Sequence, residues 1–260
     1  MFSTGHLEGC RKSIRVVRNY FVKFANNDRS RHFWIDSLRP LSIKRQIDVI
    51  RNHPSLLSQL KKTYKGYKIV PVHQSDEVYL SVSPDKRKGS DKALSDCHYD
   101  APFAMVPQGG NKFIRMIIAL NYNDSVYTQV GKQKSVLSTG DFNIIDYNRD
   151  YHCVHGSIPH GRYRLLLKLH FVLVPENSSE AATQFCIDIN NWWIHASRTI
   201  MNMSINPQTF GEHSVAYIVE TARLLYNNAN LTISSLLLLL LIVLCCISGT
   251  FRGRLTRYSY

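Results

Sequence analysis

The stretch at residues 162–174 constrains the fold more than any other part of the chain. Apolar or aromatic side chains occupy every second position from Tyr163 to Leu173. Residues two apart in a β-strand share one face of the sheet, so this face is expected to pack against a core. The opposite face carries Arg164, Leu166, Lys168 and His170. The pattern predicts a long strand with one packed face and one face that can carry polar groups.

Further strand-like segments precede this stretch and are separated by turn residues. They lie at residues 98–106, 112–122, 125–137 and 142–147, with two shorter runs at residues 67–71 and 77–82. Pro71 indicates that the first short run is an edge strand. Such a series predicts an antiparallel sandwich or barrel.

Segments with helical spacing flank the predicted strands. Residues 1–66 are expected to form a basic helical region that packs on a core of residues 67–175. In this region Ser42 can cap one helix and Pro54 separates it from the next. Residues 176–229 are expected to form helices at 181–203 and 212–226. The predicted fold class is α+β with one main domain, because a chain of 260 residues with 44% hydrophobic content can bury a full core.

Residues 231–248 contain an unbroken apolar run and precede a basic tail at residues 249–260. A helix of that length spans roughly 27 Å, close to the hydrocarbon core of about 30 Å. We therefore expect a transmembrane helix that acts as a single-pass C-terminal anchor. Because the N-terminus shows no apolar signal segment, the main domain is expected in the cytosol, on the endoplasmic reticulum or the mitochondrial outer membrane. The arginines of the tail favour the opposite orientation.

Charge and cysteine content limit the binding partners and the cellular compartment that suit this chain. The chain has 32 Lys and Arg against 19 Asp and Glu, and most of this excess lies in residues 1–97. Such a basic region suits nucleic acid, an anionic membrane or an acidic substrate, or is simply a solvated surface. The six cysteines show no CxxC spacing and favour a reducing compartment. Cys97 and Cys153 are expected to be small apolar packing residues.

A candidate metal site begins with His98 and Asp100, which would share one face of a strand. His155, from a later segment, would complete a set of two imidazoles and one carboxylate. That set leaves open positions on the metal and suits non-haem Fe(II). His152 would face the side opposite to His155, and we expect it, like His160 and His170, to be an ordinary polar position.

Residues 97–174 resemble the double-stranded β-helix core, a jelly-roll or cupin-like fold, of the Fe(II)/2-oxoglutarate-dependent dioxygenases, particularly the prolyl-hydroxylase-like branch. The resemblance rests on the His98-x-Asp100 pair, the Gly140-Asp141 turn before a strand, His155, and Arg164 nine residues later. It implies that His98, Asp100 and His155 bind the iron. It also implies that Arg164, with Arg162 as its rival, pairs with the distal carboxylate of 2-oxoglutarate, and that Tyr122 adds a hydrogen bond to this cosubstrate.

The same resemblance implies an activity: hydroxylation of a protein or peptide side chain, using Fe(II), 2-oxoglutarate and O2, with ascorbate as reductant. Residues 127–132 replace a Gly-Gly segment that many hydroxylases of this branch carry, which bears on the type of substrate. Two other hypotheses stay open. The site could demethylate or hydroxylate nucleic acid held by the basic N-terminal region, or the domain could be a catalytically inactive interaction module on a membrane.

Overall fold

The computed structural model describes residues 2–25, 30–82, 97, 110–147, 149–205, 207 and 209–227. The chain divides into two compact units, residues 1–195 and 196–260. The predicted strand at residues 98–106 and the predicted membrane helix at residues 231–248 lie outside the described residues. Within the described ranges, no helix has the length and apolar character that a membrane span requires.

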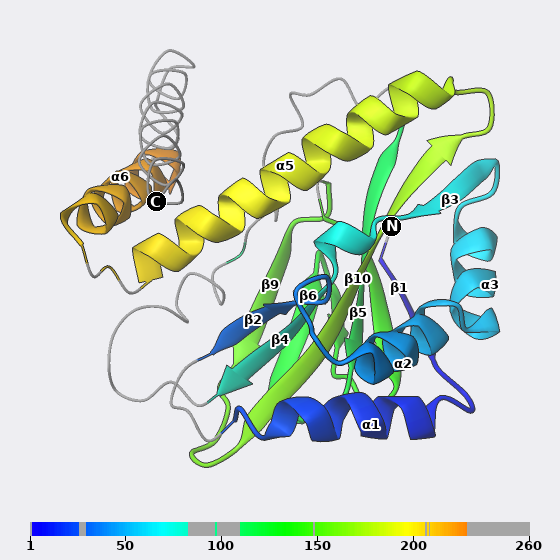
Figure 1. The fold of residues 1–260 in the computed structure, drawn as a ribbon, viewed down its shortest axis with the longest axis horizontal. Coiled ribbons are helices and arrows are strands. Elements are labelled where there is room, and N and C mark those ends of the chain that lie inside the picture. The colour runs from blue at the N-terminus through cyan, green and yellow to red at the C-terminus, as the bar shows by residue number, and fades with distance from the viewer. Residues whose placement is uncertain are drawn as a thin grey trace, which may run out of the picture. The chain divides into compact units, whose positions relative to one another are not determined.

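A large antiparallel sheet organises the first unit (Figure 1). Its strands lie in the order β1 (Ser3–His6), β8 (Asp141–Asp146), β5 (Lys112–Ala119), β10 (Tyr163–Pro175), β4 (Glu77–Val82) and β2 (Arg31–Trp34). A further strand, β3 (Tyr67–Pro71), pairs with the C-terminal part of β10. The sequence predicted only helices for residues 1–66, but β1 and β2 come from that region and form the two edges of the sheet.

A smaller antiparallel sheet contains β7 (Gln133–Ser135), β6 (Val126–Val130) and β9 (His152–Gly156), in that order. The single strand predicted at residues 125–137 is therefore a hairpin. Its tight turn has Gly131 at φ 57°, a left-handed conformation that glycine adopts without strain. Strand β9 was not predicted, because its sequence does not alternate between apolar and polar residues.

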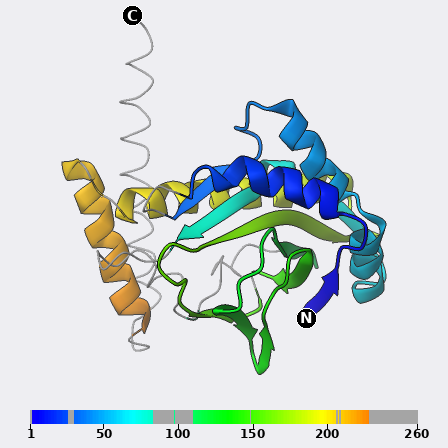
Figure 2. The ribbon, with the colours of Figure 1, turned by 90° about the horizontal axis from the view of Figure 1, so that it is seen from below.

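Three N-terminal helices cover one face of the large sheet, and the small sheet lies on its other side (Figure 2). The helices are α1 (Arg11–Val22), α2 (Leu41–Arg51) and α3 (Pro54–Thr63), and a short 3-10 helix, η1 (His73–Ser75), precedes β4. Their buried residues, such as Phe21, Ile47 and Leu60, share one core with Leu165 and Leu167 of β10. The alternation predicted for β10 is therefore confirmed, and each buried leucine contributes about 1.5–3 kcal/mol.

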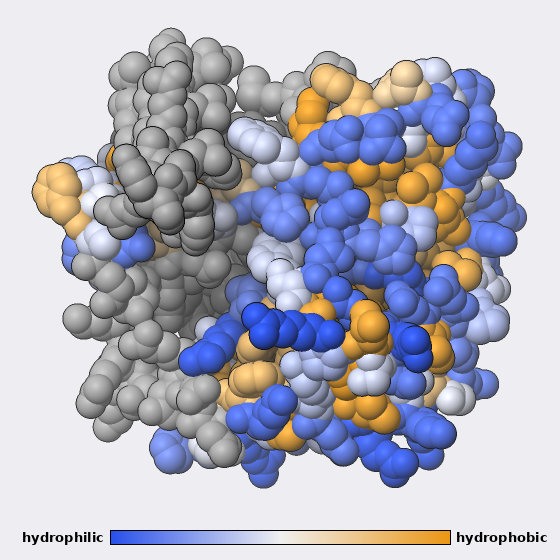
Figure 3. Space-filling model, viewed as in Figure 1, coloured by the Kyte–Doolittle hydropathy of each residue, from blue (hydrophilic) through white to orange (hydrophobic). Residues whose placement is uncertain are grey.

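The other face of β10 belongs to a second core. There Leu166, Val172 and Val174 pack with residues of β5 and with Cys186 and Ile194 of α5 (Glu180–Ile205). The face of the molecule in Figure 3 is mainly hydrophilic, with small hydrophobic patches between the polar side chains. The second unit contains the end of α5 and the helix α6 (Phe210–Asn227), so both helices predicted after residue 176 are present.

Candidate active site

The two sheets face each other, and the residues that join them identify their inner faces. Val130 of β6 belongs to the same core as Ile117 of β5 and Leu166 of β10. The Ser135 hydroxyl of β7 donates a hydrogen bond of 2.8 Å to Asn143 Oδ1 of β8. Side chains that share a face with Val130 or Ser135 therefore point from the small sheet toward the large one.

Strand β9 presents two histidines to opposite sides. His152 pairs with inward-facing Val130, whereas His155 pairs with Tyr127, which lies on the other face of β6. His152 is only 4% exposed, and its Nδ1 lies 3.0 Å from the carbonyl oxygen of Asp150. The His155 ring stacks on Tyr127 with a centroid distance of 5.0 Å. The structure thus brings His152, rather than the predicted ligand His155, to the inner face.

Basic side chains line the inner face of the large sheet. Lys168 of β10 donates a hydrogen bond of 2.9 Å to Glu77 Oε1, and His32 Nδ1 lies 2.7 Å from Glu77 Oε2. Arg115 Nε of β5 donates to His170 Nε2 at 2.9 Å. Lys168 and Arg115 therefore each have a hydrogen-bond partner inside the protein.

Arg164 differs from its basic neighbours on this face. It is 7% exposed and lies opposite Ser81 of β4, yet its guanidinium makes no hydrogen bond or ion pair with any residue that the structure describes. Desolvation by burial lowers its pKa to about 10, against a smaller opposing effect of Tyr79. A guanidinium can form two parallel hydrogen bonds to the two oxygens of one carboxylate.

Asn121 fixes the backbone on both sides of Arg164. Its Nδ2 donates to the carbonyl oxygen of Tyr163 at 2.9 Å, and its Oδ1 accepts from the amide of Leu165 at 2.7 Å. This role could not be predicted from the sequence, because Asn121 and Arg164 become neighbours only when β5 and β10 pair.

Two other predicted cosubstrate residues lie elsewhere. Arg162 is exposed in the turn before β10, where its amide donates to the carbonyl oxygen of Pro159 at 3.0 Å. Tyr122 is 57% exposed. The tyrosine close to Arg164 is Tyr79, which is buried on the inner face. The predicted ligands His98 and Asp100 lie outside the described residues.

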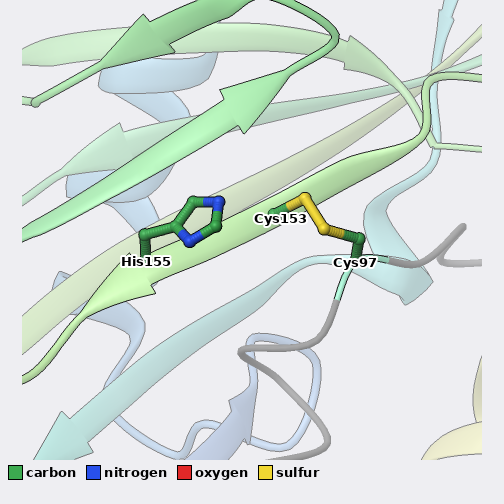
Figure 4. A group of neighbouring side chains, drawn as sticks. All are labelled: Cys97, Cys153 and His155. Carbon is green, nitrogen blue, oxygen red and sulfur yellow. A yellow bond between two sulfur atoms is a disulfide. The ribbon is translucent and has the colours of Figure 1, made fainter.

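A disulfide joins Cys97 to Cys153 of β9, with Cα atoms 4.1 Å apart (Figure 4). The expectation that these two cysteines are separate packing residues is therefore wrong. Spacing along the chain could not reveal the pair, because 56 residues separate the two cysteines and only the fold brings them together. The bond places the residue before His98 beside the strand that carries His152 and His155.

No family model matches the sequence, and no curated protein is similar to it. Several solved structures are similar in part. A viral collagen prolyl hydroxylase of Paramecium bursaria Chlorella virus-1 has 11% identity, covers 66% of this chain and 90% of its own, and has a TM-score of 0.43. A Pseudomonas putida prolyl-4-hydroxylase has 12% identity, covers 65% of this chain and 91% of its own, and has a TM-score of 0.42. The structure of prolyl 4-hydroxylases from Phytophthora capsici has 13% identity, covers 85% of this chain and 79% of its own, and has a TM-score of 0.44.

Proposed function

We propose that this chain is an Fe(II)/2-oxoglutarate-dependent hydroxylase whose two facing sheets form a double-stranded β-helix. The observation that carries the proposal is Arg164: a buried guanidinium, on the inner face between the sheets, without a carboxylate partner among the described residues. Burial of an unpaired charge lowers stability, so its presence is explained by a carboxylate ligand that arrives from outside. The distal carboxylate of 2-oxoglutarate supplies such a group.

The metal ligands that we propose are His98, Asp100 and His152. The disulfide sets Cys97 beside Cys153, which faces outward with His155. His98 directly follows Cys97 in the sequence, so the disulfide ties the His98-x-Asp100 pair to the strand that carries His152. The contact of His152 Nδ1 with a backbone carbonyl favours the tautomer in which Nε2 can bind a metal. His155, which the sequence predicted as the third metal ligand, is the alternative to His152.

This donor set, two imidazoles and a carboxylate, fits Fe(II). When bound there, iron would supply the oxidative chemistry that couples decarboxylation of 2-oxoglutarate to hydroxylation of a C–H bond. The chain's own residues would orient and shield the cosubstrate. Arg164 would pair with its distal carboxylate, Asn121 would hold Arg164 in place, and the apolar side chains of Ala119 and Leu166 on the same inner face would exclude water.

We propose a protein or peptide side chain as the substrate, as the resemblance to the prolyl-hydroxylase-like branch implies. We also propose that residues 231–248 anchor the enzyme in a membrane, with the catalytic domain on the cytosolic side. Protease treatment of intact membranes would test the anchor: the tail at residues 249–260 should be protected while the main domain is digested. Digestion of both would contradict this topology.

The test of activity uses the full-length chain in mild detergent with Fe(II), ascorbate and 2-oxoglutarate. We expect succinate to form, and we expect His152→Ala to abolish it while His155→Ala retains it. Retained activity in His152→Ala together with its loss in His155→Ala would return the ligand role to His155. If the wild-type chain neither forms succinate nor binds 2-oxoglutarate in the presence of Mn(II) without oxygen, the proposed function is wrong. Candidate peptides can then be searched for a one-oxygen mass gain.

A further inference from the structure

The outer face of the small sheet carries a second group of metal-ligating side chains, separate from the proposed active site. The sulfur atoms of Cys97 and Cys153 and a ring nitrogen of His155 all lie within 4.8 Å of one another, as Figure 4 shows. Cys153 and His155 are two residues apart on β9, so they share a face. We propose that, once the disulfide is reduced, these three side chains bind Zn²⁺ or a similar soft divalent cation.

The chemistry of the three groups selects the metal. Cysteine thiolates and a neutral imidazole are the common ligands of zinc, with Zn–S distances near 2.3 Å and Zn–N distances near 2.0–2.1 Å. A tetrahedral site then needs the two sulfur atoms about 3.8 Å apart. Cα atoms 4.1 Å apart allow this separation by rotation of the cysteine side chains. Three protein ligands leave the fourth position to water or another group.

The oxidation state of Cys97 and Cys153 decides whether the proposed metal site can form. In the disulfide each sulfur is bonded to the other, so neither is a thiolate. A dithiol reductant breaks the S–S bond, gives up two electrons and two protons to form two cysteine thiols, and becomes a cyclic disulfide itself. Binding of the cation then displaces the two thiol protons to solvent. Cys97 and Cys153 therefore either link two segments covalently or, together with His155, bind a metal ion.

The pairing of β9 with β6 keeps this site apart from the proposed active site. His155 and Cys153 face away from the large sheet, whereas His152 faces toward it. Two other cysteines of the described residues, Cys10 and Cys186, are buried in other parts of the core. They offer matched controls, because removing either leaves the three proposed ligands intact.

Cobalt(II) is a direct probe, since thiolate ligands give it a near-ultraviolet charge-transfer band that nitrogen and oxygen ligands do not. The full-length chain is reduced with dithiothreitol, freed of it without oxygen, and titrated with Co²⁺. We expect the band in the wild type and in Cys186→Ala, displacement of the cobalt by Zn²⁺, and no band in the oxidised protein. The band should disappear in Cys97→Ser and Cys153→Ser, and His155→Ala should weaken cobalt binding at least tenfold.

A second measurement needs no variant. In the reduced wild type, Zn²⁺ should protect Cys97 and Cys153 from alkylation, as read by peptide mass spectrometry. No band in the reduced wild type, a band that survives in Cys97→Ser, or alkylation of both cysteines in the presence of Zn²⁺ would overturn the proposal. Succinate formation by the oxidised protein reads the proposed function separately, so the failure of one is distinguishable from the failure of the other.

Discussion

Replacing Arg164 by methionine should raise stability while it removes cosubstrate binding. Desolvation lowers the Arg164 pKa to about 10, a shift that corresponds to a destabilisation of about 3 kcal/mol for its charged form. Because a lowered pKa of a base disfavours the protonated folded state, this cost is fully present at every pH below about 10 and is relieved only above it. Methionine has a similar shape and no charge.

At neutral pH we therefore expect Arg164→Met to increase the free energy of unfolding by about 1–3 kcal/mol, which denaturant titration can measure. Binding of 2-oxoglutarate should weaken at least 100-fold, because two hydrogen bonds to a charged group contribute about 1.5–3 kcal/mol each. Calorimetric titration with Mn(II) and without oxygen checks this, and saturating 2-oxoglutarate should raise the melting temperature of the wild type only.

Arg162→Met is the matched control, since Arg162 is exposed and its loss should change stability by less than about 0.5 kcal/mol. The reasoning is refuted if Arg164→Met loses more than about 1 kcal/mol of stability and still binds 2-oxoglutarate as the wild type does. That result would mean that the guanidinium has an internal partner and no role with the cosubstrate.

Three further substitutions test the surroundings of the site. Asn121→Asp removes the donor to the Tyr163 carbonyl and should raise the KM for 2-oxoglutarate more than it lowers kcat; a change in kcat alone would contradict its positioning role. Asp76→Ala leaves Arg51 buried without its ion-pair partner and should cost about 3–5 kcal/mol in denaturant titration; a loss below about 1 kcal/mol would show that the pair is dispensable. Gly156→Ala places a Cβ against the Ser125 carbonyl oxygen at a positive φ, whereas Gly66→Ala, the control, has only the positive φ. Gly156→Ala should therefore lower the melting temperature clearly more than Gly66→Ala does. Equal decreases in melting temperature would contradict the steric clash with Ser125.

The large sheet was predictable where strand patterns are strong. In β10 the period of two assigned each side chain to the correct face, because one face is filled with leucines that can only be buried. The hairpin of β6 and β7 was read as one strand, since Gly131 and Lys132 are a short interruption in a run of suitable residues. Strands β1 and β2 are four residues each, too short for a period to be seen.

The candidate site was predicted less completely, because its geometry depends on partners far away in sequence. Alternation along residues 152–156 shows that His152 and His155 face opposite sides, but only the pairing with Val130 and Tyr127 shows which side is inner. Similarly, the choice between Arg164 and Arg162 depends on burial, which the sequence leaves open. The structure buries Arg164 and exposes Arg162, and this difference in burial supports the proposal that Arg164 binds the cosubstrate.

The alternation of β9 has a consequence for how this region can change by mutation. His152 lies on one face and Cys153 with His155 on the other, so a substitution on one face leaves the side chains of the other face in place. A shift of one residue in the pairing of β9 with β6 would act differently, because it would turn every side chain of the strand to the opposite face. Such a shift would move Cys153 and His155 into the interior and His152 out of it. Point substitutions in β9 should therefore be tolerated far more often than mutations that shift its pairing.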